Sequence, residues 1–152
     1  MAITIVLADD HLAYRAYLRT KLNQEPDMTV VAQAEDGQAA VQTVQDLARQ
    51  SQAPDLVIMD VTMVGMNGMV ATRQIRSSHP SVKVLALSIY DNRQFMEAMV
   101  QAGASGYVLK DDTFTDLTRA IRAVAACQTS FSPGLSLPTS GGGPPTDPGV
   151  ES

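Results

Sequence analysis

Five polar residues of this 152-residue chain stand where short apolar runs end, and their side chains suit phosphoryl chemistry. They are Asp9, Asp10, Asp60, Ser88 and Lys110. Carboxylates that lie together repel one another unless a cation neutralises them, and oxygen donors without His or Cys at metal-ligand spacing favour a hard ion, Mg²⁺ or Mn²⁺. A lysine balances phosphoryl charge, a serine hydroxyl donates to a phosphoryl oxygen, and an aspartate can be the nucleophile. The set predicts phosphoryl transfer onto an aspartate.

Each of these residues also has an ordinary interpretation. A single Asp after a strand more often forms a turn or caps a helix than binds a ligand, and Asp9 could be such a cap. Ser88 could simply close a strand, and Lys110 could be a solvated charge. The agreement of five positions at four separate strand ends favours the functional interpretation.

The elements that must position these residues follow from the hydrophobic pattern. Runs rich in Val, Ile and Leu, each of strand length, occupy residues 3–8, 28–34, 55–59, 82–88 and 106–110. Segments with apolar residues at helical spacing follow each run. Strands that are apolar at nearly every position are typical of a parallel sheet buried on both faces. The pattern predicts an α/β, flavodoxin-like (βα)5 three-layer sandwich with a parallel five-stranded sheet in the order 2-1-3-4-5.

This strand order brings the five polar residues together. In a doubly wound sheet, ligands bind at the carboxyl ends of the strands, where the strand order reverses. Strands 1 and 3 are neighbours in that order, so Asp9, Asp10 and Asp60 meet at one edge of the sheet. Strands 4 and 5 place Ser88 and Lys110 on the other side of Asp60.

Composition argues against several other classes of protein. The chain has 11 basic and 16 acidic residues and a formal net charge of -5, which disfavours binding a nucleic-acid backbone by charge. No apolar run is long enough to cross a bilayer, and the N-terminal sequence MAITIVLADD lacks the basic start of a signal peptide. The single cysteine, Cys127, suits a reducing compartment. We expect a cytoplasmic protein without direct membrane or DNA contact.

The last part of the chain differs in composition from the rest. Residues 132–152 hold five of the eight prolines, five of the ten glycines and no Lys or Arg. Such a segment has too little apolar surface to offset the entropy of ordering it. We therefore predict one folded domain over residues 1–130 and a flexible Pro/Gly-rich tail or linker over residues 131–152.

Four short motifs give the sequence a family resemblance. They are ADDH at residues 8–11, MDVTMVGMNG at 59–68, LALSIYDN at 85–92 and ASGYVLKD at 104–111. In this order they closely resemble the receiver domain of bacterial two-component response regulators. The ADDH start, GMNGMVATRQIR and LTRAIRAVAA are most similar to the NarL/FixJ subgroup.

The resemblance implies a role for each site residue. It makes Asp60 the phosphoacceptor, with Ser88 and Lys110 in contact with the phosphoryl group. Mg²⁺ would be held by Asp9 and Asp10 with Asp60, completed by the backbone carbonyl of Thr62, and Tyr107 would be the aromatic side chain that moves with Ser88 on switching. The phosphodonor would be a sensor histidine kinase or a phosphotransfer protein. The output partner is not implied, and a homodimer is left open.

The same residues are compatible with other functions. Members of the subgroup usually carry a C-terminal helix-turn-helix, so the chain is either a stand-alone receiver or the receiver half of a DNA-binding transcriptional regulator. A phosphatase with an aspartyl-phosphate intermediate would need a second acid or base, and Thr62 is a poor one. A flavodoxin-like FMN carrier would need a phosphate loop where Asp9 and Asp10 stand, and these acids would repel phosphate.

Overall fold

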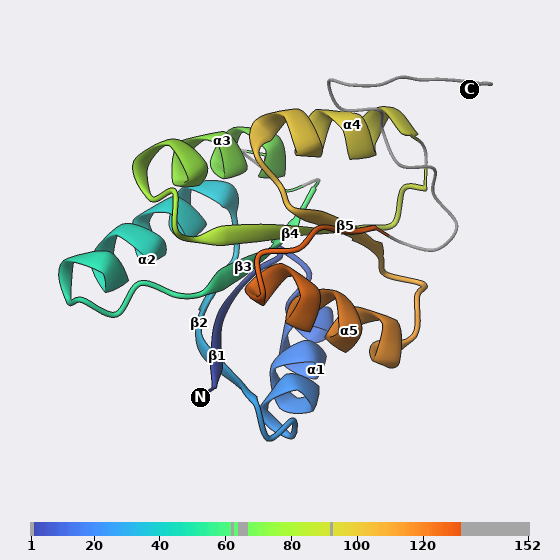
Figure 1. The fold of residues 1–152 in the computed structure, drawn as a ribbon, viewed down its shortest axis with the longest axis horizontal. Helices are drawn as coiled ribbons and strands as arrows, with labels where there is room; N and C mark the ends of the chain where they lie inside the picture. The colour runs from blue at the N-terminus through green and yellow to red at the C-terminus, as the bar shows by residue number, and fades with distance from the viewer. Residues whose placement is uncertain (1, 62, 64–66, 92, 132–152) are drawn as a thin grey trace.

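The computed structural model describes residues 2–61, 63, 67–91 and 93–131. Strands and helices alternate along this part of the chain (Figure 1). The strands are β1 Ile3–Ala8, β2 Met28–Ala34, β3 Leu56–Asp60, β4 Lys83–Ser88, β5 Gly106–Leu109 and β6 Ser130–Phe131. The helices are α1 Leu12–Asn23, α2 Gly37–Arg49, α3 Gly68–Ser78, α4 Arg93–Ala102 and α5 Phe114–Ala125.

The strands form one parallel sheet in the order β2-β1-β3-β4-β5-β6. The predicted order of the first five strands is confirmed, and with it the flavodoxin-like fold. In Figure 1, α2, α3 and α4 cover one face of the sheet, and α1 and α5 cover the other. Each helix thus connects two parallel strands of the sheet, and α2 carries the chain from β2 past β1 to β3.

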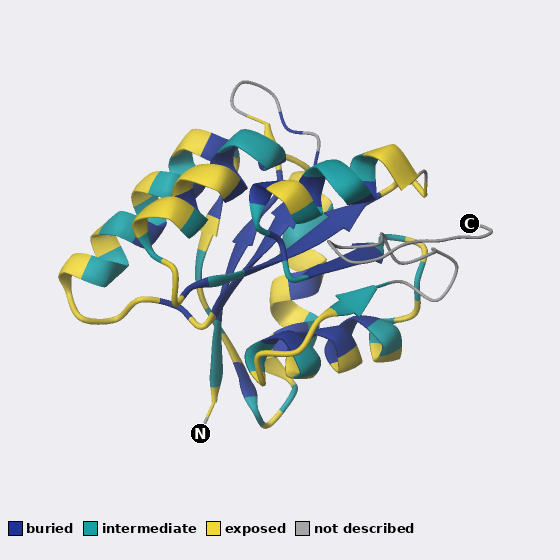
Figure 2. Cartoon of the chain, turned by 45° about the horizontal axis from the view of Figure 1, so that its top comes forward, coloured by how far each residue is buried: buried dark blue, intermediate teal, exposed yellow. Residues whose placement is uncertain are grey.

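Alternate strand residues build the two halves of the core. Val6 and Ala8 of β1 belong to the cluster that contains Val44 of α2, whereas Ile5 and Leu7 of the same strand belong to the cluster of α1 and α5. Because successive side chains of a strand point to opposite faces, an apolar strand serves both layers. Figure 2 shows the strands buried between helices whose outer faces are exposed.

Local sequence signals set several helix ends. Asp36 caps α2, where its carboxylate accepts a hydrogen bond from the backbone N–H of Ala39 at 2.7 Å. Gly103 follows α4 with φ +115°, a left-handed conformation that favours glycine. An acid before a helix and a glycine after one are common signals of helix ends, so the residue types at both positions agree with the observed ends.

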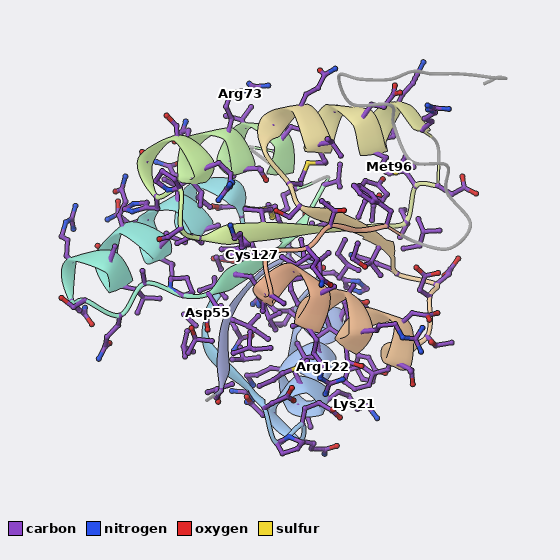
Figure 3. The ribbon with its side chains drawn as sticks, in the orientation of Figure 1. Lys21, Asp55, Arg73, Met96, Arg122 and Cys127 are labelled. Carbon is purple, nitrogen blue, oxygen red and sulfur yellow. The ribbon has the colours of Figure 1, made fainter. Side chains whose placement is uncertain are left out.

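A cluster of ion pairs joins α5 to the connection between α1 and β2. Arg122 of α5 lies 2.8 Å from Glu25 Oε1 and 2.8 Å from Asp27 Oδ2, both acids belonging to the connection between α1 and β2. Figure 3 shows Arg122 on the side of α5 that faces α1, and Met96 of α4 against the opposite face of the sheet. These ion pairs lie before the start of β2 and therefore at the opposite end of the parallel strands from Asp60.

The sixth strand is a feature that the hydrophobic pattern did not predict. Ser130 pairs with Gly106, and Phe131 pairs with Tyr107. A Cβ at Gly106 would lie 2.5 Å from the carbonyl oxygen of Ser130, so the close approach depends on the missing side chain. Two residues are too few to show a strand period. Phe131, the first residue of the segment 131–152 that composition predicts to be flexible, belongs to this strand, and residues 132–152 lie outside the described residues.

Candidate functional site

Three carboxylates meet at the carboxyl edge of the sheet. Asp9 and Asp10 follow β1, and Asp60 is the last residue of β3. Because Ala8 pairs with Met59, the register places the acids next to one another. One carboxylate oxygen from each of the three lies within 4.8 Å of the other two. Asp9 and Asp60 are 4% and 5% exposed, whereas Asp10 is exposed to solvent. The structure thus brings together the three acids that the strand order predicted.

Lys110 reaches the same acids from the end of β5, at the same edge of the sheet. It follows β5, and its backbone N–H donates a 2.8 Å hydrogen bond to the carbonyl of Ser88. Its Nζ lies 3.0 Å from Asp9 Oδ2 and 3.7 Å from Asp60 Oδ2. The Lys110 side chain is 13% exposed, so solvent screens these ion pairs only weakly. One ammonium group therefore offsets part of the charge of three carboxylates.

The loop after β1 fixes the orientation of Asp9. The backbone N–H of His11 donates to Asp9 Oδ1 at 2.8 Å, and the guanidinium of Arg15 donates to the Asp9 carbonyl. Asp9 Oδ2 is buried and receives no hydrogen bond of regular geometry from any described residue, its close neighbour being the Lys110 ammonium. A buried carboxylate oxygen in this state, next to two further carboxylates, fits a divalent cation with oxygen ligands.

The position of Asp60 depends on a glycine at the start of α3. A Cβ added at Gly68 would lie 2.2 Å from the Asp60 carbonyl oxygen and 3.0 Å from the Cα of Val61. The N–H of Gly68 donates to the Val61 carbonyl at 3.0 Å, and Asn67 caps the helix by accepting from the N–H of Val70. The absence of a side chain at residue 68 thus lets α3 begin directly against the end of β3.

Ser88 and Tyr107 are linked through the loop that follows β4. The Ser88 Oγ accepts a hydrogen bond from the N–H of Tyr90 at 2.9 Å, and the Tyr107 hydroxyl donates to the Tyr90 carbonyl at 2.8 Å. Ser88 and Tyr107 are both buried. Burial raises the pKa of Tyr107, and the Ser88 hydroxyl opposes that increase. A change at the Ser88 hydroxyl can therefore reach Tyr107 through one residue.

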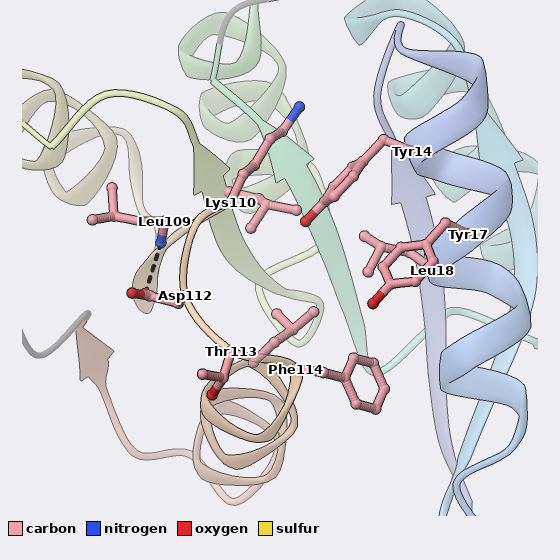
Figure 4. A pocket seen from close by; sticks show the side chains of 10 residues that line it. Tyr14, Tyr17, Leu18, Leu109, Lys110, Asp112, Thr113 and Phe114 are labelled. Atoms are coloured by element: carbon pink, nitrogen blue, oxygen red, sulfur yellow. Dashed lines mark hydrogen bonds between the residues drawn. The ribbon is translucent and has the colours of Figure 1, made fainter.

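Tyr14 is a member of the site that the sequence pattern did not single out. Lys110 Nζ lies 4.8 Å from the centroid of the Tyr14 ring. In Figure 4 the two side chains extend toward each other, Tyr14 from α1 and Lys110 from the loop after β5, above a pocket of about 60 Å³. Burial, and then the negative charge of Asp9, raise the pKa of Tyr14 to about 12. Tyr14 recurs with Leu18 and Leu22 at a spacing of four residues, which predicts only that it packs in the core. The one sequence feature that points to the site is that Tyr14 follows Asp9 and Asp10 by a few residues.

The predicted site residues are thus gathered with one exception. The structure places Asp9, Asp10, Asp60 and Lys110 in one cluster of charged groups, with Ser88 at the end of the neighbouring strand. Thr62, predicted as a backbone ligand, lies outside the described residues. Among the helices that the structure describes, none has the length and hydropathy of a membrane span.

Comparison with known proteins agrees with this geometry. Residues 5–122 match the family described as "Response regulator receiver domain". The chain is 40% identical over 123 residues to the transcriptional regulatory protein DegU of Brevibacillus brevis, covering 81% of this chain and 50% of that protein. The chain therefore spans about half the length of this curated relative.

Two solved structures have the same fold. A two-component response regulator of the LuxR family from an Aurantimonas species is 32% identical with a TM-score of 0.82, covering 89% of this chain and 93% of that one. The signal receiver domain of the response regulator NarL from Mycobacterium tuberculosis is 30% identical with a TM-score of 0.75, covering 82% and 97%.

Proposed function

The chain belongs to the response regulator receiver domain family, whose members are phosphoacceptor switches rather than conventional enzymes, and we propose that Asp60 accepts its phosphoryl group. The observation that carries this assignment is that Asp60 is close both to the other two acids and to an ammonium group. One of its carboxylate oxygens lies within 4.8 Å of an oxygen of Asp9 and of Asp10, and the Lys110 ammonium lies 3.7 Å from its Oδ2. Of the three acids, Asp60 alone ends a central strand, between β1 and β4.

The arrangement supports a direct transfer. An oxygen of Asp60 forms a bond to phosphorus while the P–N bond of a phosphohistidine donor breaks, and the donor histidine keeps the electron pair. Lys110 offsets charge on the phosphoryl oxygens, and the Ser88 hydroxyl can donate to one of them once it turns from Tyr90. Mg²⁺, with Mn²⁺ as a second fit, would be held by Asp9, Asp10 and Asp60 and would reduce the repulsion between carboxylate and phosphoryl group.

The same contacts support a switch. We propose that phosphorylation draws Ser88 toward the phosphoryl group, so that the Tyr90 backbone shifts and Tyr107, which donates to the Tyr90 carbonyl, changes its position. The resulting change would lie on the surface formed by α4, β5 and α5.

Partners and context follow from the family. We propose a sensor histidine kinase or a phosphotransfer protein as donor, in the cytoplasm. DegU is a transcriptional regulatory protein, so the chain could also be the receiver part of a DNA-binding regulator. In the described residues all five helices cover the sheet, so we propose that this part binds no DNA directly. An aspartyl-phosphate phosphatase is less well supported, because the residue two positions after Asp60 is Thr62, whose hydroxyl is a poor acid or base for turnover.

The phosphoacceptor assignment is tested by intact mass. Incubation of the purified chain with acetyl phosphate and Mg²⁺ should add one base-labile phosphate, and Asp60→Asn should abolish the addition because an amide is not a comparable nucleophile. Asp46→Asn is the matched control, since Asp46 is an exposed acid on α2. Equal labelling of the Asp60→Asn variant would overturn the assignment.

The metal assignment is tested by calorimetry. Asp10→Ala removes one oxygen ligand and one negative charge, so it should weaken Mg²⁺ binding and slow phosphorylation together, and EDTA should have the same effect on the unmodified chain. Undiminished Mg²⁺ affinity in the Asp10→Ala variant would contradict the site.

A further inference from the structure

The aromatic ring beside Lys110 suggests an additional role in the reaction. The Lys110 ammonium lies 4.8 Å from the centroid of the Tyr14 ring, within the range of a cation–π contact. Such contacts are stronger where solvent is excluded, and Lys110 is largely buried. Tyr14 is half-buried on α1 and packs against the cluster of Leu18 and Leu22. The ring is therefore fixed by the helix while the lysine stem is flexible.

The partners of the Lys110 ammonium are two carboxylates and one aromatic ring, and they differ in what happens to them during the reaction. The closer partner, Asp9 Oδ2 at 3.0 Å, is one of the carboxylate oxygens available to a divalent cation. A cation bound there competes with Lys110 for the same oxygen, because both are positively charged. The neutral ring of Tyr14 is not a ligand for such an ion. It is therefore the contact that stays with Lys110 when the acids are occupied.

We propose that Tyr14 is a positioning residue, whose ring holds the Lys110 ammonium at the pocket after a divalent cation has taken over the Asp9 carboxylate. The inference rests on the proposed function of Asp60 and Lys110. It assigns no bond-making step to Tyr14. Its effect is to keep a long side chain in the orientation that the phosphoryl group needs, so that less freedom is lost when the group arrives.

Three variants separate this role from simple packing. Tyr14→Phe keeps the ring and removes the hydroxyl. Tyr14→Leu keeps apolar volume on α1 and removes the ring. Tyr17→Leu is the matched control, because Tyr17 lies one turn further along α1 and lines the same pocket but carries no lysine over its ring.

The contact has a spectroscopic signature that does not depend on phosphorylation. Protons above an aromatic ring are shifted upfield, so the ε-methylene protons of Lys110 should be upfield of those of Lys83. The chain has three lysines, and Lys21, over the ring of Phe114 at 5.0 Å, serves as an internal reference. Tyr14→Leu should abolish the Lys110 shift without changing that of Lys21, whereas Tyr14→Phe and Tyr17→Leu should preserve it. In the unmodified chain the shift should persist with saturating Mg²⁺.

The functional measurement is the initial rate of phosphorylation by acetyl phosphate at saturating Mg²⁺. Tyr14→Leu should lower the rate by roughly 3- to 10-fold, as expected for the loss of one cation–π contact. Tyr14→Phe and Tyr17→Leu should stay within about 2-fold of the unmodified chain. A Lys110 shift that vanishes on adding Mg²⁺, or an unchanged rate in Tyr14→Leu, would overturn the proposal. If the unmodified chain took up no phosphate at all, the function assigned to Asp60 would fail, while the NMR data would still report on Tyr14 and Lys110.

Discussion

Lys110 lies closer to Asp9 than to Asp60: its Nζ is 3.0 Å from Asp9 Oδ2 and 3.7 Å from Asp60 Oδ2. Asp9 follows β1 and Lys110 follows β5, so this ion pair reaches across the ends of β3 and β4. The pair occupies the buried carboxylate oxygen that receives no regular hydrogen bond in the described residues. The Lys110 ammonium thus provides positive charge at the same Asp9 oxygen that would be available to a divalent cation.

Replacing this lysine should therefore affect metal binding and phosphorylation in opposite directions. Lys110→Met keeps the length of the side chain and removes its charge, which leaves three carboxylates without their buried counter-charge. We expect Mg²⁺ affinity to rise by about tenfold, measured by calorimetry. Phosphorylation by acetyl phosphate should nevertheless slow, because the phosphoryl oxygens lose a positive neighbour.

The control for this experiment is Lys83→Met, at the start of β4 and therefore at the opposite end of the strands from the acids. That variant should leave both quantities unchanged. Weaker Mg²⁺ binding in Lys110→Met would show that the ammonium supports the site rather than competing with the cation.

A second prediction concerns the link between Ser88 and Tyr107. Ser88→Ala removes the Oγ that accepts from the Tyr90 N–H, and with it a group that can turn to the phosphoryl oxygen. Phosphorylation of Asp60 should still occur, but the chemical-shift change that it produces at Tyr107 should shrink. Equal changes at Tyr107 in the unmodified chain and in Ser88→Ala would refute the coupling. Thr118→Ala, a second buried hydroxyl on α5, is the control.

Much of the fold could be predicted because its strands carry an unambiguous signal. A parallel sheet buried on both faces requires near-continuous apolar runs, and β1, β3, β4 and β5 have them, so their predicted bounds differ from the observed ones by at most one residue at each end. The two-residue β6 gave no such signal. Its position depends on the tertiary contact between Gly106 and Ser130, which no local pattern encodes.

The site was predictable to the extent that topology alone determines it. Acids after β1 and at the end of β3 must be neighbours once the strand order is known. The contact of Tyr14 with Lys110 joins α1 to the loop after β5, and it depends on the rotation of α1 about its axis. Spacing along the chain carries no information on that angle between distant elements. For the same reason, the sequence does not show that residue 68 must lack a side chain, which follows only from the position of the Asp60 carbonyl beside it.

A third prediction concerns the close approach of Gly68 to the Asp60 carbonyl. Gly68→Ala would place a methyl group 2.2 Å from the Asp60 carbonyl oxygen, so α3 or the end of β3 must move. We expect a loss of about 1–3 kcal/mol in the free energy of unfolding, as for other overpacked sites. The rate of Asp60 phosphorylation should fall as well. Urea denaturation and intact mass measure the two effects, and Gln74→Ala, exposed on the same helix, should change neither.

A fourth prediction concerns the pH dependence of Tyr14. Its pKa in the folded chain is raised from 10.0 to about 12, chiefly by burial and then by the charge of Asp9. A group whose pKa is raised on folding stabilises the fold fully below its unfolded pKa and loses that contribution as the pH rises through the folded value. Stability from Tyr14 should therefore be complete below pH 10 and decline toward pH 12. In an ultraviolet titration, Tyr14→Phe should lack the component that ionises near pH 12, and a titration curve identical to that of the unmodified chain would contradict the assignment.

The last prediction separates the sixth strand from the segment that follows it. Phe131 pairs with Tyr107 and packs against the cluster to which Tyr107 belongs. Because its side chain is only partly buried, Phe131→Ala should cost about 1–2 kcal/mol in the free energy of unfolding and lower the melting temperature by several degrees.

Deletion of residues 133–152 should have no such effect, because composition predicts a flexible segment with few native contacts there. The truncated chain keeps Phe131 and every residue of the acidic pocket, so its melting temperature and its rate of Asp60 phosphorylation should match those of the full chain. Differential scanning calorimetry of the two forms, with Phe131→Ala in each, measures both contributions. If truncation alone lowered the melting temperature as much as Phe131→Ala does, residues 133–152 would have to be part of the folded domain. The proposed boundary, just after the strand that pairs with Tyr107, would then be wrong.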